Sequence, residues 1–133
     1  MYAGQLAKNK TFLESVRNAS KEISVYGECG GYMVLGETLI DDAGKSHKML
    51  NLLDLVTSIE KPKLTLGYRK LTSVSGPLKG TFTGHEFHYA RTLEANGKKL
   101  FTTRDASDNS LPNLGLVNGR VSGSFAHIID RYE

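Results

Sequence analysis

Hydrophobic and polar residues in the first part of the chain follow a helical period and then a strand-like one. Residues 11–14 read Thr-Phe-Leu-Glu, the form of a capping box, and apolar residues then recur at helical spacing. This pattern predicts a helix that ends between Asn18 and Ser20, and we expect a short exposed helical turn before it at residues 2–8. The β-branched run at residues 23–26 predicts a strand, and the apolar run at residues 31–35 predicts a second helix.

The second half of the chain alternates between polar and apolar residues as β-strands do. Residues 64–71 and residues 82–92 both alternate, and Ser75-Gly76-Pro77 marks a turn between them. We therefore expect the two segments to pair as antiparallel strands. Residues 36–62 contain a turn at Asp41–Gly44 but show no clear period, so the pattern predicts no regular element there.

The strongest hairpin signal lies near the end of the chain. Residues 114–117 and 120–126 flank the dipeptide Asn118-Gly119. Asn-Gly suits the two left-handed positions of a type I′ turn, which joins adjacent antiparallel strands. The sequence therefore predicts a C-terminal β-hairpin.

Taken in order, these segments describe a single α/β domain with antiparallel strands in its C-terminal half. A chain of 133 residues is long enough for one compact core and short for two. A strand such as residues 23–26 is expected to lie between parallel neighbours, yet no strand precedes the first helix to supply one. We therefore expect the first strand of the domain to lie outside residues 1–133.

Charge and composition exclude several classes of partner. The 17 Lys and Arg residues exceed the 14 Asp and Glu residues by only three and are scattered, so nucleic acid is not indicated. No stretch reaches the roughly 20 apolar residues of a membrane span, and residues 1–10 lack the apolar core of a signal peptide. A single cysteine excludes a disulfide framework. We expect a cytoplasmic protein with no membrane partner.

The lone cysteine, Cys29, lies where the predicted strand ends and the second helix begins. Gly27, Gly30 and Gly31 surround it, which is the layout of a nucleophile elbow. The positive end of the following helix favours a thiolate, so we expect the pKa of Cys29 to be depressed. The alternative interpretation is that Cys29 is a small buried hydrophobic residue, as many free cysteines are.

A cysteine nucleophile needs a base, and histidine is the usual one. His127 is expected at the end of the last strand, where active-site groups of open α/β sheets gather. His47 lies in a polar loop, where a surface role is the simpler interpretation. Alternation places His85 on one face of its strand and His88 on the other, so these two do not suggest a metal site, and we expect no metal.

Four motifs together resemble a known family. They are Tyr26–Glu37, which contains Glu-Cys-Gly-Gly, then Leu66–Arg69, Gly84–Tyr89 and Ser124–His127. In this order they resemble the C-terminal glutamine amidotransferase domain of the cobyrinic acid a,c-diamide synthases, over nearly the whole chain. The Glu-Cys-Gly-Gly core is shared with the related cobyric acid synthases. The resemblance implies a three-layer, flavodoxin-like domain of the class I glutamine amidotransferase type.

The resemblance also implies the chemistry. Cys29 would attack the side-chain amide of glutamine and form a γ-glutamyl thioester, while His127 would act as general base and then as acid. The Gly30 backbone N–H would supply half of the oxyanion hole. The released ammonia would serve a partner synthetase domain, which uses ATP and Mg²⁺ to amidate the a- and c-side-chain carboxylates of a corrinoid. No cofactor is implied in the amidotransferase domain itself.

Further residues of these motifs are candidates for contact with substrate or with the synthetase domain. They are Glu28, Gly31, Tyr68, His85, Glu86 and His88. We expect Glu86 and His88 to share one face of their strand, and a pair that only orients the strand is the alternative. Gly44-Lys45-Ser46 imitates the end of a phosphate-binding loop, but Leu39 stands in place of its first glycine, so we reject that interpretation.

The chain departs from the family pattern at two places. The family's glycine-rich oxyanion loop lies upstream of the residues that match Tyr2 and Ala3, and we expect it and the synthetase domain to lie outside the chain. The usual glutamate two residues after the histidine is Ile129 here, and Asp130 follows it. Either Asp130 serves as the third member of a triad or Cys29 and His127 work as a dyad.

Three other functions remain open on the sequence alone. A cobyric acid synthase-type amidotransferase would use the same Cys29 and His127, and so would another elbow-type cysteine hydrolase such as a peptidase or a deglycase. A catalytically incomplete interaction domain would retain Cys29 only as a relic. Because one oxyanion donor is expected outside the chain, we expect the isolated chain to be a weak glutaminase or an inactive one.

Overall fold

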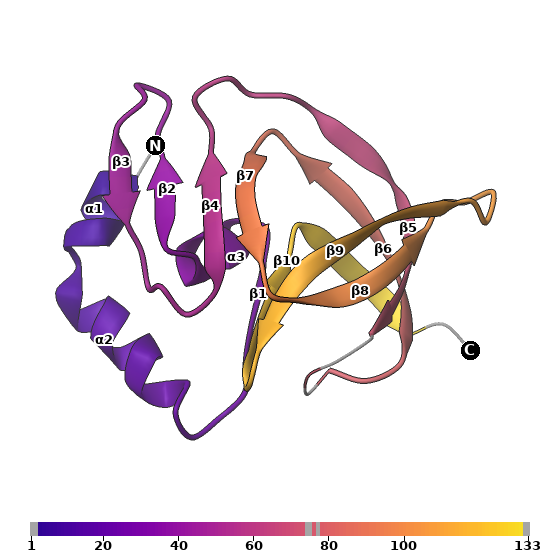
Figure 1. Ribbon diagram of the computed structural model, residues 1–133, viewed down its shortest axis with the longest axis horizontal. Helices are drawn as coiled ribbons and strands as arrows, with labels where there is room; N and C mark the ends of the chain where they lie inside the picture. The colour runs from indigo at the N-terminus through magenta and orange to yellow at the C-terminus, as the bar shows by residue number, and fades with distance from the viewer. Residues whose placement is uncertain (1–2, 74–75, 77, 132–133) are drawn as a thin grey trace.

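The computed structural model describes residues 3–73, 76 and 78–131, and within these residues the chain forms helices and strands with strands prevailing (Figure 1). The helices are α1 (Ala3–Lys8), α2 (Lys10–Ala19) and α3 (Gly30–Leu35). The strands are β1 (Val25–Glu28), β2 (Thr38–Ile40), β3 (Ser46–Lys48), β4 (Asp54–Ser58), β5 (Thr65–Ser73), β6 (Thr81–His88), β7 (Arg91–Asn96), β8 (Lys98–Arg104), β9 (Ser110–Asn118), β10 (Val121–Ser124) and β11 (Ala126–Arg131). The prediction of an α/β chain is confirmed.

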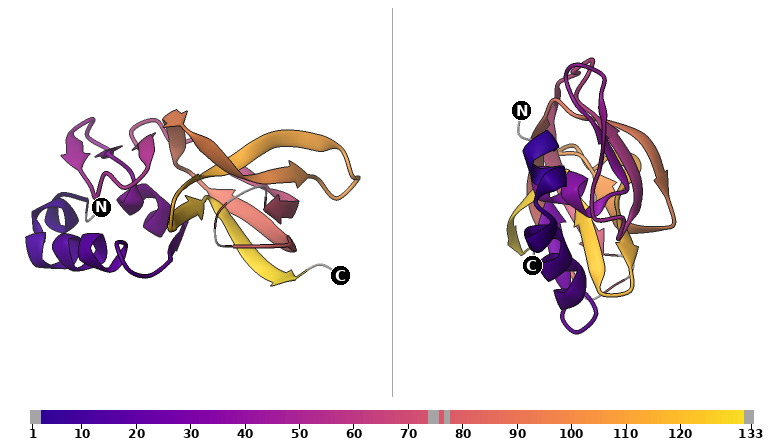
Figure 2. Two further views of the ribbon diagram at one scale, coloured as in Figure 1. Left: turned by 60° about the horizontal axis from the view of Figure 1, so that its bottom comes forward. Right: turned by 90° about the vertical axis from the view of Figure 1, so that its left-hand side faces the viewer.

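The predicted first helix is present as α2, but it begins earlier than the capping box indicates. The Asn9 side chain accepts a hydrogen bond from the Phe12 N–H at 3.1 Å and caps the helix, so Thr11 lies inside the first turn. Leu13 is buried, as the helical spacing requires. The preceding turn, α1, is more than an exposed turn because Ala3 lies in the core. Figure 2 shows both helices together at one end of the molecule.

A seven-stranded sheet carries most of the C-terminal half. Its order is β1-β10-β9-β8-β5-β6-β11, and β1 pairs with β10 in parallel. Strands β10 and β11 are consecutive in the chain yet lie at different places in this order, β10 beside β1 and β11 beside β6. The sheet therefore curls round on itself, and Phe125 is the corner between β10 and β11. Strand β1 stands at one end of the order, so its parallel neighbour in the described residues is β10 alone.

The two antiparallel pairings predicted from the sequence are present. Strand β5 pairs with β6 along its length, and β9 pairs with β10 in a hairpin. The turn of the hairpin differs from the prediction: Asn118 pairs with Val121, so Gly119 and Arg120 form the loop. Gly119 has a φ of 60° and Arg120 is not among the residues with positive φ. A positive φ at the first loop residue alone matches a type II′ turn, not the type I′ turn expected. The predicted turn at Ser75–Pro77 falls largely outside the described residues.

A second sheet, absent from the sequence prediction, covers the segment that lacked a clear period. Its order is β3-β2-β4-β7, and three of these strands come from residues 36–62. The segment predicted as one strand over residues 82–92 breaks after His88, because β6 lies in the first sheet and β7 in the second. The segment Gly44-Lys45-Ser46 leads into strand β3. A phosphate-binding loop leads into a helix, so the rejection of that interpretation is confirmed.

Close backbone packing joins β1 to α3 and explains one of the glycines around Cys29. A Cβ at Gly27 would lie 2.8 Å from the carbonyl group of Gly31 and 2.8 Å from Leu35 Cδ1. Only glycine permits this approach without displacement of the helix. The apolar side of α3 then enters the larger of two core clusters through Tyr32, Met33 and Leu35. None of the helices in the described part of the chain is long and apolar enough to cross a membrane.

Candidate active site

Cys29 occupies a strained turn between β1 and α3. Its backbone has a φ of 54° and a ψ of −108°, which a residue with a side chain adopts rarely and at a cost of about 1–3 kcal/mol. The turn is held from both sides: the Cys29 N–H donates to the Ser124 carbonyl of β10 at 2.9 Å, and the Met33 N–H donates to the Cys29 carbonyl at 3.2 Å. This is the strand–turn–helix geometry that a nucleophile elbow requires.

Space is open beside Cys29 on the side of the following helix. A Cβ built on Gly30 or on Gly31 would meet no atom within 4 Å, in contrast to Gly27. Packing within the described structure therefore does not require glycine at either position. At Gly30 the space leaves room for a ligand to approach the cysteine and the Gly30 backbone N–H, whereas Gly31 lines an apolar pocket that α1, α2 and β1 form with α3.

The expectation of a depressed thiol pKa is wrong. Burial raises the pKa of the Cys29 thiol, and the negative charge of Glu28 raises it further. A hydrogen bond with the Gly30 backbone acts in the opposite direction but does not outweigh these effects. Cys29 is half-buried, and its raised pKa disfavours the thiolate, so the thiol needs a base to remove its proton.

His127 lies on the strand that follows the corner at Phe125. It is the second residue of β11, not the end of the preceding strand as predicted, because the strand breaks at Phe125. The Phe125 side chain is buried between the Tyr32 ring, 5.2 Å away edge to face, and the His88 ring, stacked at 4.3 Å. The Cys29 N–H donates to the carbonyl of Ser124, and His127 follows Ser124 by three residues on the other side of the corner.

The His127 imidazole lies between a histidine ring and a carboxylate. The His85 ring stacks on it with ring centres 5.4 Å apart, and Glu28 Oε1 lies 3.7 Å from its Nδ1. The other oxygen of Glu28 accepts hydrogen bonds from the Ile128 N–H at 2.9 Å and from the Tyr26 hydroxyl at 3.2 Å. Glu28 thus joins β1 to β11 across the corner.

Asp130, the sequence candidate for a third triad member, lies elsewhere. A β-bulge between Ile128 and Asp130 separates it from His127. Asp130 is exposed, and its carboxylate accepts the N–H of Arg131 at 2.8 Å. Among the described residues, the carboxylate within ion-pair distance of His127 is that of Glu28. Sequence reasoning gave Glu28 only a contact role, because its neighbour across the corner is 99 positions further along the chain.

Glu86 and His88 share one face of β6, as predicted, but that face is buried. Glu86 receives a hydrogen bond from Arg69 Nε at 2.8 Å and contacts His88 Nε2 at 3.1 Å, and His88 Nδ1 lies 3.1 Å from the Ala90 carbonyl. Burial would raise the pKa of Glu86, but the hydrogen bonds from His88 and Arg69 and their charges hold it below its usual value. Both side chains are buried within the described structure, which favours the alternative of a pair that orients the strand, while contact with substrate or with another domain stays a prediction.

Tyr68 and His85 lie on the opposite, exposed face. The register pairs Tyr68 with His85 and His85 with His127, so the three form one row across β5, β6 and β11. Leu66 and Phe87 form the neighbouring pair, and Tyr89 packs edge to face on Phe87. We call these apolar residues and the histidine beside them the outer face: Leu66, Tyr68, His85, Phe87 and Tyr89. Each of its four apolar members is between 44% and 61% exposed, so the outer face is a large apolar surface that adjoins His127.

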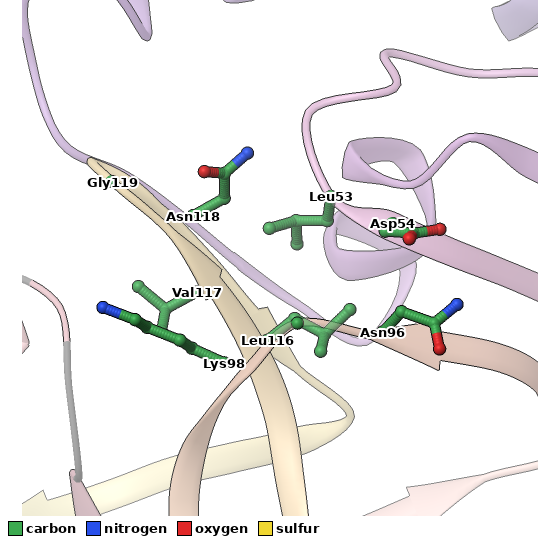
Figure 3. A pocket seen from close by; sticks show the side chains of 9 residues that line it. Leu53, Asp54, Asn96, Lys98, Leu116, Val117, Asn118 and Gly119 are labelled. Atoms are coloured by element: carbon green, nitrogen blue, oxygen red, sulfur yellow. The ribbon is translucent and has the colours of Figure 1, made fainter.

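Other features of the structure lie away from this corner. A pocket of about 340 Å³ is lined by residues of β4, β7, β8 and β9, with Leu53, Asp54, Lys98 and Asn118 around it, and contains no candidate catalytic residue (Figure 3). His47 is not in a surface loop as expected: it lies on β3, and its Nε2 is 2.7 Å from Asp41 Oδ2. In the described part of the chain, no group of three or more His, Cys, Asp or Glu residues is placed to hold a metal ion.

Comparisons with known proteins point to one family. Residues 1–132 match the model of the CobB/CobQ-like glutamine amidotransferase domain. The chain is 48% identical over 133 residues to the hydrogenobyrinate a,c-diamide synthase of Brucella anthropi, which covers 98% of the chain and 30% of that protein. It is 43% identical to the enzyme of the same name from Rhodobacter capsulatus and 44% identical to that of Rhizobium meliloti, over 97% and 98% of the chain and 31% of each relative. The chain thus spans about a third of the length of these curated relatives.

Proposed function

Because the chain belongs to the CobB/CobQ-like glutamine amidotransferase domain family, we propose that Cys29 is the nucleophile that releases ammonia from glutamine. The observation that carries this assignment is the strained backbone of Cys29 at the turn between β1 and α3. Strain of this kind persists where the surrounding structure imposes it and is typical of active sites. The open space at Gly30 supports the assignment, since a substrate must approach the sulfur closely.

The reaction follows from the groups at the corner. His127 accepts the thiol proton as the Cys29 sulfur attacks the side-chain carbonyl carbon of glutamine, and a C–S bond forms. The Gly30 N–H donates to the carbonyl oxygen while it carries negative charge. The C–N bond then breaks, His127 returns its proton to the leaving nitrogen, and ammonia departs from a γ-glutamyl thioester. Water, deprotonated by His127, cleaves the thioester to glutamate and restores the thiol.

The raised pKa of Cys29 decides which form of the enzyme starts this cycle. A preformed thiolate is disfavoured by burial and by Glu28, so proton transfer to His127 accompanies the attack on glutamine. This arrangement slows the reaction of the sulfur with other electrophiles.

We extend the proposal to the longer protein that the relatives represent. Their name, hydrogenobyrinate a,c-diamide synthase, says that they form the a,c-diamide of hydrogenobyrinate. We propose that the longer protein likewise uses ammonia from glutamine to amidate the a- and c-side-chain carboxylates of a corrinoid, hydrogenobyrinate or cobyrinic acid, in cobalamin biosynthesis. ATP and Mg²⁺ would bind in a synthetase domain within the part of the relatives that this chain does not match. The name shared by the relatives favours this activity over that of a cobyric acid synthase. The lone free cysteine fits a reducing compartment such as the cytoplasm.

We also propose that a preceding segment completes the sheet as a three-layer, flavodoxin-like domain. Strand β1 has one neighbour, β10, in the described residues, although parallel strands are normally buried on both sides. An apolar pocket of about 230 Å³ adjoins β1 and is lined by residues of α1, α2, β1 and α3, with Leu6, Val16, Val25 and Val34 among them. A further parallel strand beside β1 would cover this pocket, and the loop after it would bring the second oxyanion donor near Cys29.

The outer face supports a second contact, with the synthetase domain. Tyr68 and His85 lie in one row with His127, and Leu66 and Phe87 extend the apolar surface beside them. Ammonia released at Cys29 must reach the acceptor without mixing with bulk water, so the two domains are expected to meet beside the catalytic histidine. The outer face provides exposed aromatic residues of the kind enriched at the centres of protein interfaces.

Glutamate release tests the proposed function. The substrate is glutamine, and the protein is a chimaera in which this chain replaces the matching C-terminal part of the Brucella anthropi relative. We expect Cys29→Ser to abolish release and His127→Ala to lower the rate by a factor of about 10²–10⁴. Asp130→Asn serves as the control because Asp130 is exposed and bonded to its own neighbour. Undiminished release by the Cys29→Ser chimaera would refute the assignment of the nucleophile.

A further inference from the structure

The carboxylate of Glu28 is placed to orient His127. Its Oε1 lies 3.7 Å from Nδ1 of the imidazole, slightly beyond hydrogen-bond distance. Hydrogen bonds between catalytic groups are often this long in the absence of substrate and shorten when it binds. The side chains of Glu28 and His127 are 29% and 38% exposed, so water does not fully surround the pair.

Two hydrogen bonds fix the Glu28 side chain in this position. Both end on Oε2, from the Ile128 N–H at 2.9 Å and from the Tyr26 hydroxyl at 3.2 Å. Burial raises the pKa of Tyr26, so its hydroxyl remains protonated and continues to donate. Because Oε2 is held by two donors, Oε1 is the oxygen that faces His127. The carboxylate therefore has a defined direction and is not a freely rotating surface charge.

We infer that Glu28, the residue directly before the nucleophile, is the positioning carboxylate of His127, in the place that a glutamate two residues after the histidine would otherwise fill. The inference rests on the proposed function and goes beyond it by completing the catalytic machinery with a residue from β1. A carboxylate beside Nδ1 requires the proton of neutral imidazole to be on Nδ1. The lone pair of Nε2 is then free to accept the thiol proton of Cys29.

The same carboxylate stabilises the imidazolium that forms when His127 takes that proton. The proton moves from Cys29 Sγ to His127 Nε2, and later from Nε2 to the leaving nitrogen, while Glu28 stays ionised throughout. Glu28 thus acts on both partners: its charge disfavours an early thiolate at Cys29, and its Oε1 orients the His127 ring.

Glu28→Gln separates positioning from mere support of the fold. The glutamine oxygen still accepts from Ile128 and Tyr26, but its NH₂ group faces Nδ1, where a second donor favours the wrong tautomer. For the equivalent substitution in a triad, kcat falls by about 10⁴, so we expect a loss on the order of 10²–10⁴ in kcat for glutamate release by the chimaera. The KM for glutamine should change little, because Glu28 acts through His127.

Alkylation of Cys29 by iodoacetamide and thermal unfolding, measured together, distinguish the loss of positioning from a structural defect. Removal of the Glu28 charge removes one of the effects that raise the thiol pKa, so Glu28→Gln should react as fast as the unsubstituted chain or faster. A disrupted elbow would also expose the thiol and speed alkylation, but it would lower Tm, whereas the loss of positioning alone should leave Tm unchanged. Glu28→Asp keeps the charge on a shorter side chain, so its kcat should be at least about tenfold higher than that of Glu28→Gln.

The outcomes distinguish this inference from the proposed function. Four results together establish Glu28 as the positioning carboxylate. The unsubstituted chimaera releases glutamate and Cys29→Ser releases none. Glu28→Gln loses most of the rate, and Asp130→Asn keeps it. The inference is overturned if Glu28→Gln retains its kcat, if Asp130→Asn shows the same loss, or if Tm falls together with kcat. Equal release by the unsubstituted and Cys29→Ser chimaeras would instead overturn the proposed function.

Discussion

Alanine at Gly27 and alanine at Gly31 should have opposite consequences, although both glycines adjoin Cys29. At Gly27 the new Cβ would lie 2.8 Å from Gly31 C and O and 2.8 Å from Leu35 Cδ1. Two of these atoms belong to the backbone, so the contact cannot be relieved by a rotation of a side chain. Overpacking of this kind costs about 1–3 kcal/mol of the free energy of unfolding. For a domain of this size that corresponds to a fall in Tm of roughly 4–12 °C.

At Gly31 the new Cβ would meet no atom within 4 Å. Alanine also favours the helix over glycine by about 0.8–1 kcal/mol, so Gly31→Ala should melt at the same temperature or slightly higher. In the chimaera, where we propose that a further strand covers the apolar pocket lined by Gly31, the methyl group would press on that strand, and glutamate release should fall. Thermal unfolding followed by circular dichroism, together with glutamate release, measures both effects. The reasoning is refuted if Gly27→Ala melts with the unsubstituted chain or if Gly31→Ala melts as low as Gly27→Ala.

Three further predictions concern single groups. Iodoacetamide should alkylate Cys29 of the unsubstituted chain more slowly at pH 7 than it alkylates a free cysteine, because burial and Glu28 raise the thiol pKa; a faster reaction would contradict the geometry of the site. The pKa of Glu86 is lowered in the folded state, so its stabilisation is present above about pH 4.3, the usual value, and is lost as the pH falls through the lower folded value. The Tm difference between the chain and Glu86→Gln should therefore shrink on acidification from pH 6 to below about pH 4.3, and a constant difference would count against the Arg69–Glu86–His88 network. Serine at Leu66 and Phe87, both exposed, should leave Tm unchanged but weaken binding of this chain to a separately produced synthetase portion of the Brucella anthropi relative; unchanged binding, measured by calorimetry, would place the interface elsewhere.

The parts of the structure that sequence reasoning found are those set by local rules. The elbow is encoded by glycines on both sides of Cys29, and the hairpin by Asn118-Gly119 between two alternating segments. Even there the details depended on the register: pairing of Asn118 with Val121 moves the loop by one residue and changes the turn type. Local pattern thus located the turns but did not fix their geometry.

The parts of the structure that sequence reasoning missed depend on contacts between residues far apart in the chain. Strands β2 and β3 have three residues each, too few to show an alternating pattern, and β2 is held by parallel pairing with β4. The break in the last strand arises because Phe125 packs between the Tyr32 and His88 rings, which belong to other elements. The pairing of Glu28 with His127 likewise exists only because the sheet curls to bring β1 and β11 together.

The pKa of Cys29 shows the same limit in chemical terms. A position at the start of a helix favours the thiolate, and the sequence shows that position. The sequence does not show that the sulfur is half-buried. It also does not show that α3, the helix whose end would favour the thiolate, has only six residues. Burial and the adjacent carboxylate outweigh the helix end, so the sign of the shift was predicted wrongly while the position of the turn was predicted correctly.

Covalent capture of the nucleophile tests the central claim most directly. The chimaera is incubated with a glutamine-analogue electrophile, and the adduct is located by mass spectrometry of its peptides, with Cys29→Ser and Asp130→Asn as the paired variants. The account predicts one adduct within this chain, on Cys29, which excess glutamine suppresses, which is absent from Cys29→Ser and which is unchanged in Asp130→Asn. An adduct on another residue, or labelling of Cys29 that glutamine does not suppress, would contradict the claim that Cys29 is the glutamine-hydrolysing nucleophile.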